Sequence, residues 1–339
     1  MSPEAPALDK KRFESDQQVR WCPGCGDYAI LSSMLKVFAE MGVDREKVAV
    51  VSGIGCAARF PYYVEAYGFH TIHGRAPAIA TGLKVSRPDL HVWVVGGDGD
   101  ILSIGGNHFL HALRRNVTLK ILCFDNRIYG LTKGQTSPTS EVGKMTKTTP
   151  MGSLDRPVNP ISLALAAEAT FVARTADTWG NHFREVMLAA AAHEGSAFVQ
   201  VLQNCVIFNE DSWEAVVGRE QREENALFLE HGKPLRFGRN RAKGLRLRGS
   251  EPEVVTVGDG DVTEKDLAVH DEKDEALAYL LSRLDLPRFP MPVGIFHRVP
   301  GLVPLEKGIA RQRDEAMRKR GKGDVTKLIH SGDLWTVKG

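Results

Sequence analysis

Residues 91–126 read HVWVVGGDGDILSIGGNHFLHALRRNVTLKILCFDN. An apolar run at 91–95 leads into a glycine-rich turn, and a second apolar run at 117–124 ends in an aspartate and an asparagine. Between the two runs, residues 106–115 have the apolar spacing of a helix. Two short apolar strands joined by a helix indicate neighbouring parallel strands of one sheet.

The same alternation continues on both sides of this unit. It predicts an α/β fold in which a mainly parallel sheet is covered by helices on both faces. Ligands of such sheets bind at the carboxyl ends of the strands. The remaining expected helices cover 26–41, 75–85, 161–169 and 181–192, the remaining expected strands cover 48–52, 171–174 and 198–202, and residues 129–158 are expected to form a long polar loop.

The chain divides into three expected regions. Residues 1–20 are expected to be an arm, 21–210 to form the sheet domain, and 211–339 to be an irregular extension used for subunit docking. Within the extension, residues 234–249 carry six Lys or Arg and no acid, whereas 251–275 carry ten Asp or Glu against two Lys. Such charge blocks are typical of solvated loops or of docking surfaces.

The composition excludes several classes of protein. With 42% hydrophobic and 25% charged residues, the chain is typical of globular proteins. A net charge of +2 argues against a general nucleic-acid binder. No apolar run approaches the roughly 18 residues that a membrane span needs, and the first 20 residues are polar. We therefore expect a cytoplasmic protein without a membrane segment.

Asp98 directly follows the first apolar strand of the quoted stretch, and Asn126 directly follows the second. Both side chains should therefore emerge at one edge of the sheet. A carboxylate, an amide oxygen and a backbone carbonyl suit Mg²⁺, which is usually shared with phosphate oxygens. The glycines let the backbone approach those phosphates. Asp259 lies in a second Gly-Asp-Gly-Asp sequence, but no asparagine follows it, so we predict a turn there.

This pairing of Gly97-Asp98-Gly99 with Asn126 resembles the diphosphate-binding motif of thiamine-diphosphate enzymes. The resemblance implies that Asp98, Asn126 and the backbone oxygen of Ile128 hold Mg²⁺ on the diphosphate of the cofactor. The motif usually has two successive asparagines, and here the first is Asp125. Because the second asparagine is present, we expect this departure to be minor.

The cysteines allow three interpretations. Cys22-Pro23-Gly24-Cys25 could be a thioredoxin-like redox site, but residues 14–20 before it are polar and not strand-like. It could bind zinc, but the usual second Cys-x-x-Cys pair is missing. With Cys56 and Cys205, which lie at strand ends, it could bind one [4Fe–4S] cluster. Cys123 lies inside an apolar strand and is predicted to be structural.

The order of these cysteines also resembles a family, the β subunits of 2-oxoacid:ferredoxin oxidoreductases. Trp-Cys-Pro-Gly-Cys-Gly at 21–26, Gly-Ile-Gly-Cys at 53–56 and Cys205 after the last strand carry the resemblance, which covers roughly residues 15–300. Further matching stretches are His-Thr-Ile-His-Gly-Arg at 70–75, Tyr-Gly-Leu-Thr-Lys-Gly-Gln at 129–135 and Phe-Pro-Met-Pro-Val-Gly-Ile-Phe at 289–296.

The resemblance implies an enzyme that converts a 2-oxoacid and coenzyme A to acyl-CoA and CO₂ while reducing ferredoxin, or that runs the reverse reductive carboxylation. Thiamine diphosphate, Mg²⁺ and one [4Fe–4S] cluster are the implied cofactors. A partner α subunit, or a fused α/γ subunit, would supply the glutamate that activates the aminopyrimidine. We therefore expect a heterodimer or a dimer of heterodimers, and no activity from this chain alone.

The matching stretches define the expected site. Cys22, Cys25, Cys56 and Cys205 are the implied cluster ligands. Cofactor contacts are expected from fourteen residues, namely Ile54, Gly55, Cys56, His73, Gly74, Gly97, Asp98, Gly99, Asp100, Asn126, Tyr129, Gly130, Leu131 and Thr132.

Three residues are expected to serve catalysis. His73 is placed to transfer a proton or polarise the substrate; the alternative is a helix-start histidine bonded to backbone. Arg59 and Lys133 are expected to face substrate carboxylates, although both could equally be surface cations. Two such cations favour a substrate with a second carboxylate, so 2-oxoglutarate is preferred over pyruvate or branched 2-oxoacids.

Two hypotheses of other kinds compete with this interpretation. A non-redox thiamine enzyme such as a decarboxylase would share Asp98 and Asn126 but would not need four cysteines at one edge. A zinc-stabilised regulatory subunit without catalytic activity would account for the cysteines but would leave the pairing of Asp98 with Asn126 unexplained. The metal content of the protein separates these hypotheses.

Overall fold

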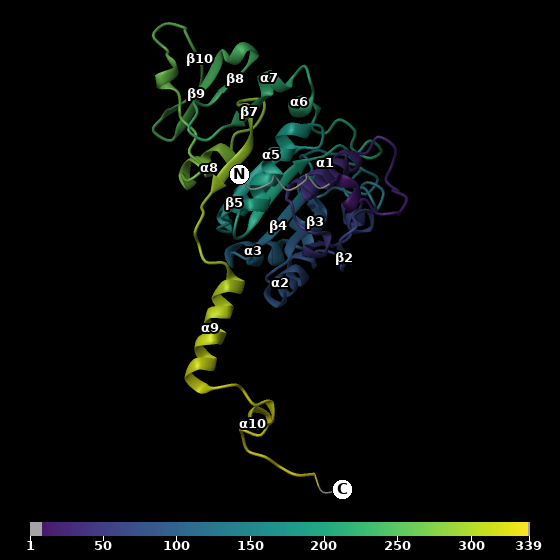
Figure 1. Ribbon diagram of the computed structural model, residues 1–339. Helices are drawn as coiled ribbons and strands as arrows, with labels where there is room; N and C mark the ends of the chain where they lie inside the picture. The colour runs from purple at the N-terminus through teal and green to yellow at the C-terminus, as the bar shows by residue number, and fades with distance from the viewer. Residues whose placement is uncertain (1–8, 338–339) are drawn as a thin grey trace.

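The computed structural model describes residues 9–337, so the first eight residues of the expected arm lie outside the described part. An eight-stranded sheet in the order β2-β1-β3-β4-β6-β5-β11-β7 runs through the molecule (Figure 1). Its strands pair in parallel except where β11 pairs antiparallel with β5. The predicted mainly parallel sheet is therefore confirmed.

The five strands expected from the sequence are buried except at the two ends of β3, which explains why the sequence reveals them as apolar runs. They are β1 (Val48–Ser52), β3 (His91–Gly97), β4 (Leu119–Asp125), β5 (Phe171–Ala176) and β6 (Ala197–Leu202). The edge strand β2 (Tyr67–His70) was not expected, because its four residues are exposed and include a glycine. No apolar pattern marks such a strand.

Helices cover both faces of the sheet, as predicted. Val92 and Val94 belong to the core under one set of helices, whereas Trp93 and Val95 belong to the core under the other, as alternation along a strand requires. The first set is α2 (Ala76–Ser86), α3 (Gly106–Arg114), α4 (Pro160–Ala166) and α8 (Glu275–Ser282), and the second set is α1 (Asp27–Glu40) and α5 (Gly180–Ala192).

The sheet extends past the expected boundary at residue 210. Strands β7 (Ala226–Leu229) and β11 (Met291–Arg298) come from the C-terminal region and complete one side of the sheet. That region is also more regular than expected, because β8 (Arg236–Phe237), β9 (Lys243–Arg248) and β10 (Glu251–Thr256) form a separate antiparallel sheet. A docking role for residues 211–339 stays a prediction.

The two charge blocks lie against one another in this small sheet. Strand β9 from the basic block pairs with β10 from the acidic block. Across this pair, Arg246 Nη2 and Arg248 Nε lie 2.9 and 3.0 Å from Glu253 Oε2. The charge blocks therefore supply complementary neighbours across two strands.

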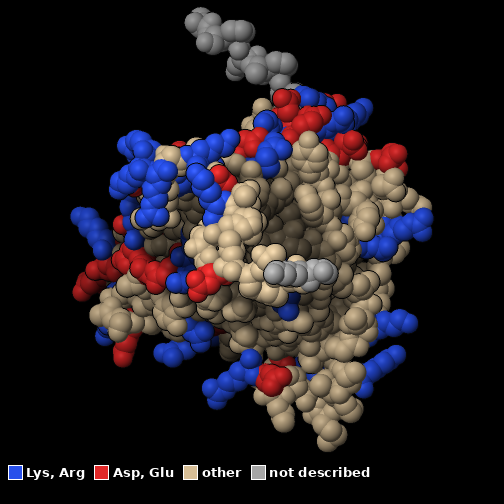
Figure 2. Space-filling view, turned by 90° about the horizontal axis from the view of Figure 1, so that it is seen from below, with Lys and Arg blue, Asp and Glu red and all other residues tan. Residues whose placement is uncertain are grey.

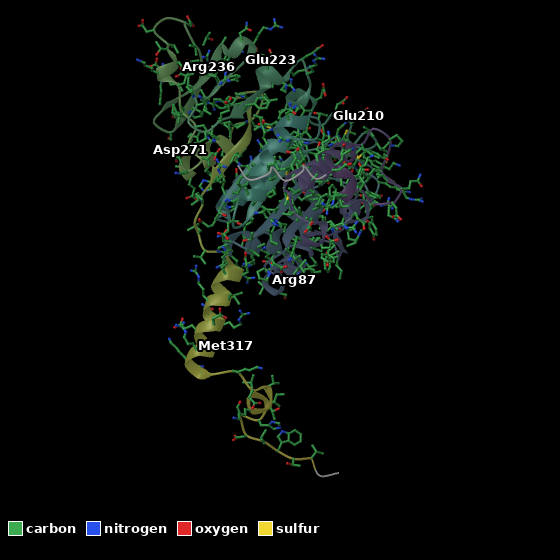
Figure 3. All side chains as sticks on the ribbon, in the orientation of Figure 1. Arg87, Glu210, Glu223, Arg236, Asp271 and Met317 are labelled. Carbon is green, nitrogen blue, oxygen red and sulfur yellow. The ribbon has the colours of Figure 1, made fainter. Side chains whose placement is uncertain are left out.

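The C-terminal helix α9 (Leu305–Arg320) projects from the body, and α10 (Val325–Ile329) lies beyond it (Figure 1). Met317, labelled in Figure 3, lies on α9 well away from the sheet. The molecule seen from this end carries acidic and basic side chains around a largely uncharged middle (Figure 2). Among residues 9–337, no helix combines the length and apolar character that crossing a membrane would take.

The remaining helical segments are short and connect the larger elements. They comprise α6 (Glu214–Val217), α7 (Arg222–Asn225), a π-helical turn at Gly99–Ile104 and 3₁₀ turns at Lys10–Phe13, Arg45–Lys47, Ala57–Tyr63, Arg239–Arg241 and Glu264–Asp266. Residues 129–158 contain no named helix or strand, as expected for the long loop.

Helix α3 offers a matched test of the core. Leu113 is fully buried, whereas Leu110, three residues earlier, is 37% exposed. Leu113→Ala should lower the free energy of unfolding by about 2–5 kcal/mol, because it removes packed methyl groups and leaves a cavity. Leu110→Ala should cost less than about 1 kcal/mol. Urea unfolding followed by circular dichroism measures both, and equal losses would contradict the assignment of this face to the core.

Candidate functional site

A cavity of about 110 Å³ opens at the carboxyl ends of β1, β3 and β4. Thirteen of the fourteen expected cofactor residues line it, all except Gly74. The full lining is Asp27, Ile54, Gly55, Cys56, Ala57, His73, Gly97, Asp98, Gly99, Asp100, Phe124, Asn126, Ile128, Tyr129, Gly130, Leu131 and Thr132. The structure thus brings together, at the predicted edge of the sheet, segments that are far apart in the sequence.

Asp98 and Asp125 lie at the ends of the neighbouring strands β3 and β4, and both are buried. One hydroxyl joins them, since Thr139 Oγ1 lies 2.6 Å from Asp98 Oδ2 and 2.8 Å from Asp125 Oδ1. Burial raises the pKa of Asp98 to about 7, and the nearby Asp125 adds to the shift. A carboxylate in this position is suited to a cation partner.

The turn after β4 places further oxygen atoms at the same edge of the sheet as Asp98. Asn126 Oδ1 accepts a hydrogen bond from the backbone N–H of Ile128 at 3.1 Å, and the side chain of Asn209 donates to the carbonyl of Asn126 at 2.9 Å. Arg127 between them has φ of 57°, a left-handed conformation that is uncommon for non-glycine residues. This turn sets the direction in which the side chain of Asn126 leaves the sheet.

Asp100 fixes the orientation of His73. Its Oδ1 lies 2.5 Å from His73 Nδ1 and also accepts from the backbone N–H groups of Gly74 and Ile54, at 2.8 and 3.0 Å. Its Oδ2 is buried and has no hydrogen-bond partner among the described residues. Since Asp100 occupies Nδ1, His73 has Nε2 left to act in the cavity. The structure therefore disfavours the alternative in which His73 is bonded to backbone.

Two glycines are required by close packing around the cavity. A Cβ added to Gly99 would lie 2.2 Å from the ring of Tyr129, whose hydroxyl donates to the carbonyl of Gly99 at 2.9 Å. A Cβ added to Gly74 would lie 2.5 Å from the backbone nitrogen of Gly105, and Gly74 has φ of 70°. Neither position accepts a side chain without displacing backbone or an aromatic ring.

Four of the five cysteines lie near the same edge. Two of these cysteines, Cys56 and Cys205, have their sulfur atoms beside Gly130. A Cβ built on Gly130 would be 3.5 Å from Cys205 Sγ and 3.6 Å from Cys56 Sγ. Burial raises the pKa of Cys56 to about 12, helped by Asp27 and by the thiols of Cys205 and Cys22. Burial also raises the pKa of Cys25, with smaller contributions from Asp27, Cys205 and Cys56.

These thiols do not converge on one point. Within residues 9–337, no group of three or more His, Cys, Asp or Glu side chains is arranged to hold a metal ion. Cys123 is fully buried inside β4, away from the other four. Its position agrees with the structural role predicted for it.

Arg59 and Lys133 do not line the cavity. Arg59 Nη1 donates to the carbonyl of Arg20 at 3.2 Å, although Arg59 is near enough to Cys56 to lower the pKa of that thiol. Lys133 is exposed in the turn after Tyr129. The geometry of this chain alone therefore gives neither residue a place beside the cofactor, and their substrate role stays a prediction.

The sequence analysis missed two polar residues of the site. Thr139 comes from the long loop, where no periodicity marks contacts with β3 and β4. Asp27 lines the cavity from the first turn of α1, and burial raises its pKa to about 7. An acidic residue two positions after Cys25, in the buried first turn of a helix, was the available signal for Asp27.

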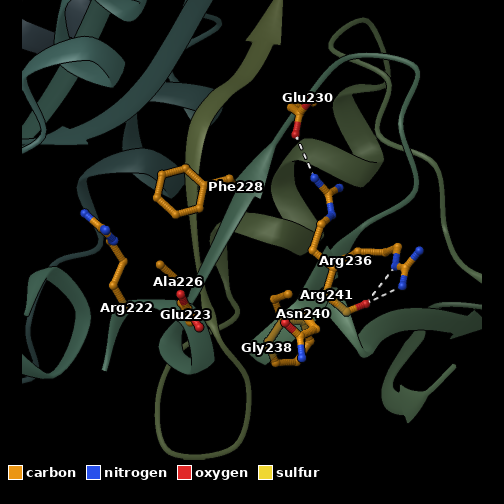
Figure 4. A pocket seen from close by; sticks show the side chains of 10 residues that line it. Arg222, Glu223, Ala226, Phe228, Glu230, Arg236, Gly238, Asn240 and Arg241 are labelled. Carbon is orange, nitrogen blue, oxygen red and sulfur yellow. Dashed lines mark hydrogen bonds and ion pairs between the residues drawn. The ribbon is translucent and has the colours of Figure 1, made fainter. Parts of the chain in front are cut away.

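A larger cavity of about 360 Å³ lies elsewhere, beside α7, β7 and β8 (Figure 4). Two of its three arginines already have partners: Arg241 Nη1 lies 3.4 Å from Glu230 Oε1, and Arg236 Nε donates to the carbonyl of Arg241 at 2.8 Å. Phe228 presents its ring to the same space. None of the residues expected to bind a cofactor lies there.

Comparison with protein families matches the region that holds the first cavity. Residues 53–201 match the thiamine pyrophosphate enzyme family, in its C-terminal TPP binding domain. This range begins directly after β1 and contains the ends of β3 and β4 and the long loop that carries Thr139. The match agrees with the identification of the diphosphate motif on Asp98 and Asn126.

Similar proteins extend the match to nearly the whole chain. The 2-oxoglutarate oxidoreductase subunit KorB of Mycobacterium tuberculosis is 53% identical over 96% of this chain and 88% of its own length. The 2-oxoacid:ferredoxin oxidoreductase 1 subunit beta of Aeropyrum pernix is 50% identical over 56% of this chain and 60% of its own length.

A solved structure agrees with these relatives. The 2-oxoglutarate:ferredoxin oxidoreductase from Magnetococcus marinus, determined with 2-oxoglutarate, coenzyme A and succinyl-CoA bound, superposes with a TM-score of 0.77 and 33% identity over 98% of both chains. The chain therefore belongs to the family of β subunits of 2-oxoacid:ferredoxin oxidoreductases.

Proposed function

We propose that this chain is the β subunit of a 2-oxoglutarate:ferredoxin oxidoreductase. Together with its partner, it would convert 2-oxoglutarate and coenzyme A to succinyl-CoA and CO₂ while reducing ferredoxin, or run the reverse carboxylation. The observation that supports this most directly is the pairing of Asp98 with Asn126 at the mouth of one cavity. The names of the relatives and the ligands of the Magnetococcus marinus structure favour 2-oxoglutarate over pyruvate.

The residues present fit thiamine diphosphate with Mg²⁺. Asp98 is a buried carboxylate without a cation partner among the described residues, and hard oxygens of Asn126 and Ile128 lie beside it in the cavity lining. Asp98, Asn126 and the carbonyl of Ile128 would hold the metal ion on the diphosphate. When bound, the cofactor supplies an electron sink for the carbon that loses CO₂.

His73 would transfer protons at this site. Its Nδ1 is held by Asp100, which fixes the orientation of the ring and leaves Nε2 for the cavity. Nε2 would accept or donate a proton at the substrate end of the cavity, close to the ring of Tyr129. Burial of Asp100 against three donors keeps this orientation rigid.

Cys22, Cys25, Cys56 and Cys205 would bind one [4Fe–4S] cluster. The other thiols add to the raised pKa values of Cys25 and Cys56, and the sulfur atoms of Cys56 and Cys205 lie beside Gly130 on the wall of the cofactor cavity. A cluster occupies a wider space than a single ion, so its four ligands surround it at greater separations. Electrons could then leave the substrate carbon over a short distance.

The remaining parts of the enzyme would come from other chains. An α subunit would complete the cofactor site as a heterodimer or a dimer of heterodimers, and ferredoxin would accept the electrons. We place this assembly in the cytoplasm. The exposed helix α9 and the segment beyond it are available for contacts between subunits.

The chain contains its own control for the metal site. Asp98→Asn should weaken Mg²⁺-dependent binding of thiamine diphosphate about 10- to 100-fold or more, because it removes the charged ligand. Asp259→Asn, in the second Gly-Asp-Gly-Asp sequence, should leave the dissociation constant unchanged, since that sequence forms a turn with Gly258 N–H bonded to the carbonyl of Val262. Calorimetric titration of the assembled complex measures both, and equal binding by the two variants would refute the site.

Iron and zinc content tests the cysteine assignment. Anaerobically purified complex should contain about four irons for this chain's cluster, lost in Cys205→Ala and retained in Cys123→Ala. Since Cys123 is buried in β4, its variant also reports any general loss of stability. Zinc without iron would instead support the regulatory-subunit hypothesis.

Lys133 provides the test of substrate preference. It has φ of 75°, which glycine adopts freely, so Lys133→Gly removes the charge without straining the turn. The ratio of activity on 2-oxoglutarate to activity on pyruvate should fall by roughly tenfold, the usual range for losing one charged hydrogen bond. An unchanged ratio would mean that another residue, in this chain or its partner, recognises the second carboxylate.

A further inference from the structure

A continuous row of buried polar side chains crosses the sheet behind the cofactor cavity. Four of its members come from strands that are consecutive in the sheet: Asp98 directly after β3, Asp125 at the end of β4, Gln200 in β6 and Arg174 in β5. The fifth, Thr139, comes from the long loop and contacts Asp98 and Asp125. All five are between 0 and 4% exposed. We call this set the polar row.

Each member is hydrogen-bonded to the next. Besides the two contacts of Thr139, Gln200 Nε2 donates to Asp125 Oδ2 at 2.6 Å, and Arg174 Nε donates to Gln200 Oε1 at 2.7 Å. Arg174 Nη1 donates at 3.0 Å to the carbonyl of Pro292 in β11. Gln200 and Arg174 are also direct partners in the pairing of β6 with β5. The polar row is thus anchored at one end by three adjacent strands.

The polar row has a fixed direction because arginine can only donate. Arg174 therefore requires the oxygen of the Gln200 amide to face it, which turns the amide nitrogen towards Asp125. Both oxygens of Asp125 then accept, Oδ2 from Gln200 and Oδ1 from the backbone N–H of Arg127 at 3.2 Å. The single hydroxyl of Thr139 lies within hydrogen-bond distance of both Asp125 Oδ1 and Asp98 Oδ2. With Arg174 removed, the Gln200 amide could rotate and Asp125 would lose this constraint.

The charges of the polar row also link Arg174 to the two carboxylates. Asp98 and Asp125 place two buried carboxylates at the ends of neighbouring strands, and the guanidinium of Arg174 is the buried cation in the same polar row. Its other surroundings include the ring of Phe296, 5.4 Å from the guanidinium carbon. Burial lowers the pKa of Arg174 to about 10, so the side chain is still charged near neutral pH and offsets Asp125 there.

We propose that Arg174 is a positioning residue for the metal and diphosphate site, acting through Gln200, Asp125 and Thr139 on Asp98. It touches neither metal nor cofactor. This inference rests on the proposed binding of thiamine diphosphate with Mg²⁺ at Asp98. It adds a determinant of affinity from β5, a strand whose residues do not line the cavity.

The test uses thiamine diphosphate and Mg²⁺ on the complex purified with its partner subunit, with binding measured by calorimetric titration. Arg174→Met should raise the Mg²⁺ concentration for half-saturation by about 10- to 100-fold, the usual effect of losing an outer partner of a metal ligand. Asp125→Asn alone should also weaken binding. The double variant should return to within about threefold of the unaltered protein, because it removes both members of the buried charge pair.

Two controls separate positioning from general stability. Lys120→Met removes another buried basic side chain, which belongs to β4 and donates to the carbonyls of His193 and Gly195. This change should lower the melting temperature without changing Mg²⁺ half-saturation. Gln200→Met keeps both charges but interrupts the polar row, and it should weaken Mg²⁺ binding as Arg174→Met does. Gln200→Met also tests the proposal if Arg174→Met does not fold.

The outcomes are distinct. Non-additive recovery in the double variant together with weak binding by Gln200→Met supports the proposal. Additive losses at Arg174 and Asp125, or unaltered binding by Gln200→Met, would overturn it and leave Arg174 as a structural partner of Pro292. If the unaltered complex does not bind thiamine diphosphate at all, the proposed function itself fails.

Discussion

Asp98, Asp100 and Asp125 are buried side by side at one edge of the sheet, and burying an ionised carboxylate is costly unless hydrogen bonds or a cation compensate. The surrounding structure is arranged around this constraint. Asp100 Oδ1 has three donors within hydrogen-bond distance. Asp125 accepts from Gln200 and from the backbone N–H of Arg127, and the single hydroxyl of Thr139 lies between Asp125 and Asp98. Asp98 is the one of the three carboxylates that lies at the expected metal position.

The inner strands could be predicted from the sequence because parallel strands buried on both faces consist of continuous apolar residues. Val48–Ser52 was predicted with its observed bounds, and the other inner strands differ by only a few residues. The strands that were missed, β2, β7 and β11, lie towards the edges of the sheet. Exposure weakens the apolar pattern of Tyr67–His70, a glycine interrupts β11, and β7 is an apolar run of only four residues.

The candidate site was predictable to the extent that its residues lie directly at strand ends. Asp98, Asn126 and Cys56 follow strands, so parallel topology alone brings them to one edge. Thr139 and Arg174 were not predictable in this way. Thr139 sits in a loop without periodicity, and Arg174 is a charged residue within a buried strand, where only its contacts with Gln200 and Pro292 explain its presence.

The position of β11 affects the order in which the protein can be made. This strand lies between β5 and β7 in the sheet, although it begins only at Met291. During synthesis, the backbone groups of β5 on that side therefore remain unpaired until residues 177–290 and then β11 have been made. Over that interval the nascent chain exposes a strand edge to its neighbours. Early occupation of that edge by a chaperone or by the partner subunit would protect it.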